Sequence, residues 1–134
     1  MDKRKYEYSH FLLFVAFSII ASIPIACVDA DPFGFNKKTI VGKYCLERFD
    51  TKSFYINKDG TDLSGCGYIG GATTYLFWNE EYVVANRSHC AGPSGWMVID
   101  LKSDSLSGPF ETEVINARFP NNKPISAQEA WKKL

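Results

Sequence analysis

Catalysis in this chain would have to centre on His89, because it is the one histidine beyond the first 26 residues. Ser88 and Ser94 lie near it in sequence and could supply a nucleophile. Asp100 or Asp104 could orient the imidazole of such a triad. A lone loop histidine is more often a surface residue, and His89 lacks the paired-ligand spacing of a zinc site. We therefore expect no catalytic residue, no metal site and no cofactor.

A glycine-rich stretch over residues 65–70 spells G-x-G-x-x-G. In dinucleotide-binding proteins this motif follows a parallel strand and opens a helix whose N–H groups meet the pyrophosphate. Here the β-branched and aromatic run 73–77 follows, which favours a strand. The stretch therefore predicts a loop and not a nucleotide site.

The first 26 residues predict a secretory signal. Lys3, Arg4 and Lys5 precede an apolar run from Phe11 to Ile25, which is the order of the basic and apolar regions of a signal peptide. This run is shorter than the roughly 20 residues that cross a bilayer as a helix. We therefore expect export and removal of residues 1–26.

Two cleavage sites compete at the end of this segment. The small residues of Val28-Asp29-Ala30 suit a signal peptidase that cuts before Asp31 and releases a soluble periplasmic or secreted protein. Pro24-Ile25-Ala26-Cys27 is similar to a bacterial lipobox, whose cysteine takes diacylglycerol on its thiol. We favour the second site, with a lipidated Cys27 and a tether over residues 27–36. Because Val28 and not an aspartate follows Cys27, we expect the protein in the periplasm, anchored to the outer membrane.

Three cysteines follow Cys27 in the sequence, namely Cys45, Cys66 and Cys90. Exported proteins form disulfides, and an odd number of cysteines leaves at most one internal pair. Cys66 and Cys90 both lie in loop-like stretches, whereas Cys45 lies in a strand-like run. We therefore expect a Cys66–Cys90 disulfide. The absence of a C-x-x-C motif argues against a redox enzyme.

The charge balance argues against nucleic acid as a partner. The 1–26 segment contains three basic and two acidic residues, which leaves 12 basic and 13 acidic residues in the other 108. A nucleic-acid-binding domain needs a basic surface that displaces counterions from phosphates. The remaining chain has neither this excess nor the low aromatic content of a disordered segment.

Strand-like segments dominate the chain beyond the tether. The residue pattern predicts strands over 40–49, 53–57, 73–78, 82–86 and 96–101, a short return strand from Leu106, and a hairpin turn at Asp59-Gly60. Helices are expected over 111–118, ended by Pro120, and over 127–133, opened by a capping box of Ser126 and Glu129. Trp131 should dock the last helix on the sheet. The chain therefore predicts one small domain over 37–134, mainly β, in which an antiparallel sheet carries short C-terminal helices.

The order of three short motifs resembles a group of small exported bacterial proteins, many of them lipoproteins. These motifs are W-N-x-x-Y from Trp78, W-x-x-I-D-x-K from Trp96, and G-P-F from Gly108. Proteins of this kind include immunity lipoproteins that neutralise periplasm-acting toxins, such as lipases delivered by type VI secretion. The resemblance implies such a role for this chain. The matching positions are scaffold residues of the motifs, namely Trp78, Asn79, Trp96, Asp100, Gly108 and Pro109.

We therefore expect a membrane-tethered binding protein that occludes a toxin or effector through its loops. Loops carried by a rigid sheet are common contact sites. The candidate contact residues lie in two loops, 62–73 and 88–95, and are Asp62, Tyr68, His89, Pro93 and Ser94. Two alternatives stay open. The first is an envelope lipoprotein with a structural or ligand-binding role, and the second is a small hydrolase that uses His89.

Overall fold

The computed structural model describes residues 36–59 and 65–134 of the chain. The expected signal segment, Cys27 with nearly all of its tether, and Asp62 lie outside the described residues. Within the described residues, no helix is long and apolar enough to cross a bilayer.

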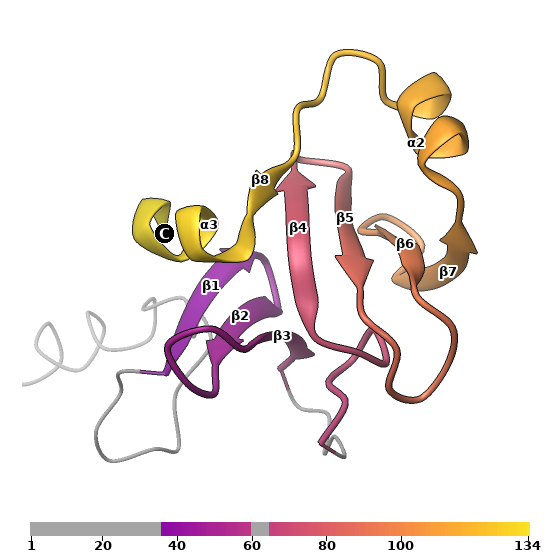
Figure 1. Ribbon diagram of the computed structural model, residues 1–134. Helices are drawn as coiled ribbons and strands as arrows, with labels where there is room; N and C mark the ends of the chain where they lie inside the picture. The colour runs from indigo at the N-terminus through magenta and orange to yellow at the C-terminus, as the bar shows by residue number, and fades with distance from the viewer. Residues whose placement is uncertain (1–35, 60–64) are drawn as a thin grey trace, which may run out of the picture.

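The described residues form two antiparallel sheets and two short helices (Figure 1), which confirms the predicted fold class. The smaller sheet has the order β1-β2-β3, with β1 at Lys37–Val41, β2 at Tyr44–Arg48 and β3 at Phe54–Lys58. The larger sheet has the order β7-β6-β5-β4-β8, with β4 at Thr73–Trp78, β5 at Tyr82–Arg87, β6 at Gly95–Asp100, β7 at Ser105–Phe110 and β8 at Ile125–Ser126. The helices are α2 at Thr112–Arg118 and α3 at Ala127–Lys133.

The prediction of one strand over residues 40–49 is wrong, because the chain reverses direction at Gly42 and Lys43. Gly42 has a φ of +56°, a conformation that glycine adopts without a clash of a Cβ atom. The reversal separates β1 from β2 and places Val41 opposite Tyr44. Two short strands therefore replace one long strand.

The hairpin turn predicted at Asp59-Gly60 lies partly outside the described residues, which end at Asp59 and resume at Gly65. β3 ends at Lys58, and the next strand along the chain, β4, belongs to the other sheet. The N–H of Asp59 instead donates to the carbonyl of Lys43 at 2.7 Å. This residue thus closes the smaller sheet next to the β1–β2 turn.

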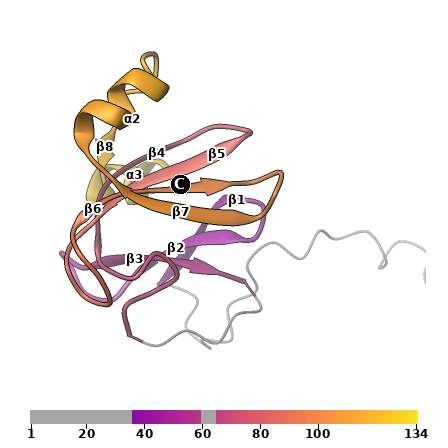
Figure 2. The same ribbon diagram turned by 90° about the vertical axis from the view of Figure 1, so that its right-hand side faces the viewer.

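The larger sheet is covered on both faces (Figure 2), which explains why β6 reads as a nearly continuous apolar run. Figure 2 shows the smaller sheet on one side of it and α2 on the other. The side chains that face the smaller sheet and α3 are Leu76, Val83, Ala85, Met97 and Ile99. Those that face α2 are Phe77, Val84, Trp96 and Val98, which pack with Ile115 and Phe119. Successive side chains of the central strands therefore enter two different apolar clusters.

Helix α3 joins the two sheets, as the sequence predicts for Trp131. Ser126 caps the helix, since its hydroxyl accepts a hydrogen bond from the N–H of Glu129 at 3.1 Å. The ring of Trp131 is 8% exposed and lies 6.0 Å from the ring of Phe54 on β3. Lys38 covers the indole from β1. The helix thereby fixes the smaller sheet against the strand pair β4–β8.

Replacing Trp131 with alanine is expected to lower the free energy of unfolding by about 3 to 5 kcal/mol, because a buried indole is removed and a cavity remains. Chemical denaturation followed by Trp or Tyr fluorescence measures this loss. The exposed neighbour Lys132 supplies the control, and Lys132→Ala should change the free energy by no more than about 0.5 kcal/mol. Equal effects of the two substitutions would contradict the placement of α3.

Candidate functional site

Two loops meet where β4 begins and β5 ends. The Cys66–Cys90 disulfide joins them with a Cα–Cα distance of 6.0 Å, which confirms the predicted pair. Two backbone hydrogen bonds add to this link, from the N–H of Ala91 to the carbonyl of Gly70 at 3.0 Å and from the N–H of Ser88 to the carbonyl of Ala72 at 2.9 Å. The two loops therefore form one cross-linked unit.

Arg87, the last residue of β5, organises this unit from inside. Strand alternation places it on the same face as Val83 and Ala85, and it is only 8% exposed. Its Nε donates to the carbonyl of Pro93 at 2.9 Å and its Nη1 donates to the carbonyl of Ile69 at 2.7 Å. Among the described residues no carboxylate pairs with this guanidinium. Its charge is therefore satisfied by carbonyl dipoles from both loops.

The glycines of the two loops make room for this packing. A Cβ atom on Gly70 would lie 2.8 Å from Nη1 of Arg87, and a Cβ atom on Gly92 would lie 2.7 Å from its Nη2. A Cβ atom on Gly71 would lie 2.0 Å from the carbonyl oxygen of Ser88. The strand β4 follows these glycines, as the sequence predicts. Of the glycines in the G-x-G-x-x-G stretch, Gly70 packs against Arg87, Gly67 lies close to the carbonyl of Ile56, and Gly65 has open space around it.

The loop unit presents a short run of exposed residues, which we call the loop surface: His89, Cys90, Ala91, Pro93 and Ser94. Three of the five predicted contact residues lie on it. Tyr68 does not, because it is half-buried, with its ring 5.6 Å from the ring of Tyr44 and under the ammonium of Lys58. Asp62 lies outside the described residues.

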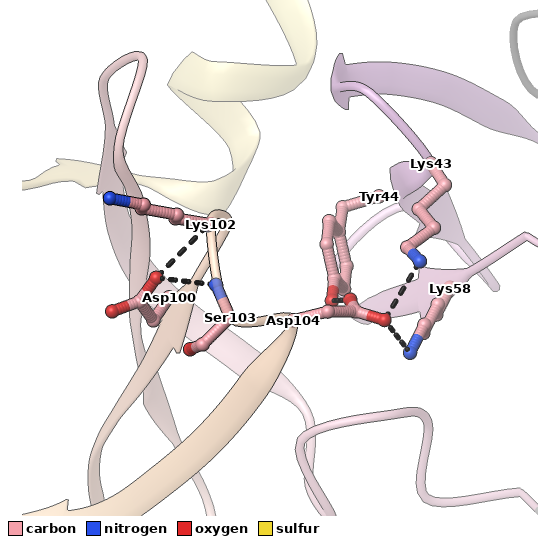
Figure 3. Close-up of polar contacts among 7 residues, drawn as sticks. All are labelled: Lys43, Tyr44, Lys58, Asp100, Lys102, Ser103 and Asp104. Carbon is pink, nitrogen blue, oxygen red and sulfur yellow. Dashed lines mark hydrogen bonds and ion pairs between the residues drawn. The ribbon is translucent and has the colours of Figure 1, made fainter.

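The two aspartates considered as partners of His89 are engaged elsewhere. Asp100 accepts hydrogen bonds from the backbone N–H groups of Ser103 and Lys102 (Figure 3), and these bonds hold the pKa of its carboxyl below the usual range. Over residues 36–59 and 65–134, no hydrogen bond reaches the imidazole of His89, and no group of three potential metal ligands occurs. The geometry therefore brings no base or acid to His89.

Asp104 is the centre of a polar cluster that sequence reasoning missed. It lies in the β6–β7 turn at a φ of +54°, a conformation in which aspartate and asparagine are over-represented. Its Oδ2 accepts from the ammonium groups of Lys43 at 2.7 Å and Lys58 at 2.8 Å, and its Oδ1 accepts from the hydroxyl of Tyr44 (Figure 3). The lysines and the tyrosine come from the smaller sheet and Asp104 from the larger one. We call these four residues the inter-sheet cluster.

The electrostatics of the inter-sheet cluster indicate a structural role. Hydrogen bonds from Lys43, Lys58 and Tyr44 hold the pKa of Asp104 well below its usual range. Burial, followed by the hydrogen bond to Asp104, raises the pKa of Tyr44 far above its usual value. The carboxylate is thus ionised and already satisfied, and the tyrosine stays protonated. Neither group is available as a base or nucleophile near neutral pH.

The inter-sheet cluster makes stability depend on pH. Because the folded-state pKa of Asp104 is depressed, its contribution is present above the unfolded-state value of about 4 and is lost as the pH falls through that value toward the folded pKa. Asp104→Asn is a suitable test, since asparagine also tolerates a positive φ. The wild-type chain should have a higher urea midpoint than the variant at pH 7, and the two midpoints should converge toward pH 2. A gap that does not change with pH would show that the charge of Asp104 is not what stabilises the fold.

The crowding of the loop glycines gives a second prediction. Gly71→Ala should destabilise the fold by about 1 to 3 kcal/mol in thermal unfolding, because the new methyl group collides with the carbonyl of Ser88. Gly65→Ala is the matched control, since a Cβ atom there meets nothing within 4 Å. It should change the free energy by no more than about 0.5 kcal/mol. If the two variants unfold alike, the two loops do not pack as described.

Comparisons of the chain with protein-family models, with curated proteins and with solved structures find no match. The resemblance to exported immunity lipoproteins therefore stays a hypothesis based on short motifs.

Proposed function

We propose that this protein is an exported immunity-type binding protein, which neutralises a protein toxin or effector by covering it with the loop surface. The observation that carries the proposal is the construction of that surface: exposed residues of one loop are cross-linked to a second loop and held from below by Arg87. A toxin that acts in the periplasm, such as a lipase effector, is the class of partner that the motif resemblance suggests.

The rigidity of the loop surface supports a binding role. A loop that is already ordered loses less conformational entropy when it docks on a partner. Here Cys90 is covalently fixed, Ala91 is hydrogen-bonded through its backbone, and the carbonyl of Pro93 holds Arg87. A disulfide and a buried arginine beneath exposed loops favour a preformed contact site over a flexible linker.

The packing of the helices favours a protein partner over a lipid ligand. A lipid-binding envelope protein would be expected to keep an open apolar groove between its sheet and its helices. In this chain Ala127, Ala130 and Trp131 are buried between α3 and the sheets, and Ile115 and Phe119 are buried under α2. The space in which an acyl chain would lie is filled by side chains.

The disulfide and the absence of a membrane-spanning helix among the described residues are compatible with a periplasmic or extracellular protein. Tethering to the outer membrane through an acylated Cys27 stays a prediction, because Cys27 lies outside the described ranges. Export places the loop surface in the compartment where a periplasm-acting toxin would be met.

A charge substitution on the loop surface tests the proposal. The purified chain is mixed with the toxin encoded by a neighbouring gene, and the affinity is measured by calorimetry or surface plasmon resonance. Ser94→Arg should weaken binding at least about tenfold, because a bulky cation is placed in the contact area, and a tenfold loss corresponds to about 1.4 kcal/mol.

The control carries the same charge change at a distant place. Ser103 is exposed in the β6–β7 turn, at the opposite end of β6 from the loop surface, and Ser103→Arg should leave the affinity unchanged. Both variants should keep the thermal midpoint of the wild-type chain. Equal affinities of the wild type and Ser94→Arg for the toxin would refute the proposed binding surface. Failure of the wild type to protect toxin-sensitive cells would refute the proposed function.

A further inference from the structure

The turn between β2 and β3 carries the most exposed large apolar side chain of the described residues. Phe49 is 79% exposed, compared with 53% for Tyr75 and 48% for Val114. A single apolar side chain at the surface is common in proteins, so the surroundings of Phe49 decide whether it has a role.

The turn that carries Phe49 has a fixed shape. The N–H of Phe49 donates to the carbonyl of Ser53 at 2.9 Å. The carboxylate of Asp50 accepts from the N–H groups of Lys52 at 2.7 Å and Ser53 at 2.8 Å, and from the hydroxyl of Ser53 at 3.0 Å. The aromatic ring is therefore held outward by an ordered turn.

Basic side chains gather between this turn and α3. The guanidinium of Arg48, next to Phe49, lies 5.0 Å from the ring centre of Trp131. The Nζ of Lys38 on β1 lies 4.8 Å from the same centre and donates to the carbonyl of Trp131 at 2.8 Å. These contacts hold the last turn of α3 beside β1 (Figure 1). We call the basic residues of these segments the basic patch: Lys38, Arg48, Lys52, Lys132 and Lys133.

The basic patch has an excess of positive charge. The ion pairs of the described residues, both to Asp104, use Lys43 and Lys58 and no member of the patch. Two acidic residues lie in the same segments, Asp50 and Glu129, so five cations against two carboxylates leave an excess of three. Glu47 lies on the opposite face of the smaller sheet, where its carboxylate accepts from Asn57. The patch is therefore basic on a chain that is otherwise close to neutral.

We propose that Phe49 and the basic patch form a docking surface for a bilayer that contains anionic phospholipids. The ring of Phe49 enters the boundary between headgroups and acyl chains, and the cations lie at the level of the phosphates. Each cation near an anionic bilayer strengthens binding about fivefold. The long stems of lysine and arginine lie against the apolar boundary while their charged ends stay among the headgroups.

The shape of this surface favours a bilayer over an acidic protein. Phe49 projects from a turn, and a fluid bilayer opens around a projecting ring, whereas a protein partner needs a pocket of matching shape. The docking surface shares no residue with the loop surface, which lies within residues 89–94. The inference therefore does not depend on the proposed binding function.

Co-sedimentation of the full chain with vesicles tests the inference. One set of vesicles is phosphatidylcholine alone, and the other is an equal mixture of phosphatidylcholine and phosphatidylglycerol. We expect the chain to prefer the anionic vesicles. Phe49→Ala should weaken binding to them about tenfold, because the apolar anchor is lost. Lys132→Glu should weaken it at least about tenfold, because a cation is replaced by an anion.

Matched variants control for the loss of an exposed apolar group and for the change of charge. Val114→Ala on α2 removes exposed apolar surface away from the patch, and Lys102→Glu reverses a charge in the β6–β7 turn. Both should bind like the wild type, and Phe49→Trp should retain binding because the indole also enters the boundary.

Two results would overturn the inference. One is a wild-type chain that binds both kinds of vesicle equally or neither. The other is a preference for anionic vesicles that Phe49→Ala and Lys132→Glu leave unchanged, because binding would then come from another part of the chain. All variants should keep the thermal midpoint of the wild type, since the substituted side chains are exposed.

Discussion

The larger sheet must bury apolar side chains on both of its faces, and the rest of the molecule follows from that requirement. Helices of seven residues are too short to cover a five-stranded sheet by themselves. One face is therefore covered by the smaller sheet together with α3, and the other by α2. The inter-sheet cluster around Asp104 and the packing of Trp131 then hold the smaller sheet in place.

The same construction determines where the protein can make contacts. Both faces of the larger sheet are occupied, and the loops at the end of β5 are exposed and cross-linked. Arg87 stabilises them from the buried side, and a Cβ atom at position 70 or 92 would crowd its guanidinium. A buried charge that has no acidic partner among the described residues thus lies beneath an exposed surface, which is the basis of the proposed binding role.

Cysteine chemistry links the fold to the location of the protein. A Cys66–Cys90 bond stabilises the loop surface, and Cys45 on β2 is disulfide-bonded as well.

Sequence patterns alone determined the fold class, the strands over 73–78, 82–86 and 96–101, both C-terminal helices and the Cys66–Cys90 pair. These features depend on local periodicity, capping and turn chemistry, which neighbouring residues carry. Only the tertiary structure decided that residues 40–49 form a hairpin, that Arg87 is buried and that Asp104 binds two lysines and a tyrosine. Those outcomes depend on contacts between residues far apart in the chain, such as Lys43 with Asp104. The local residue pattern does not indicate which distant side chains come into contact.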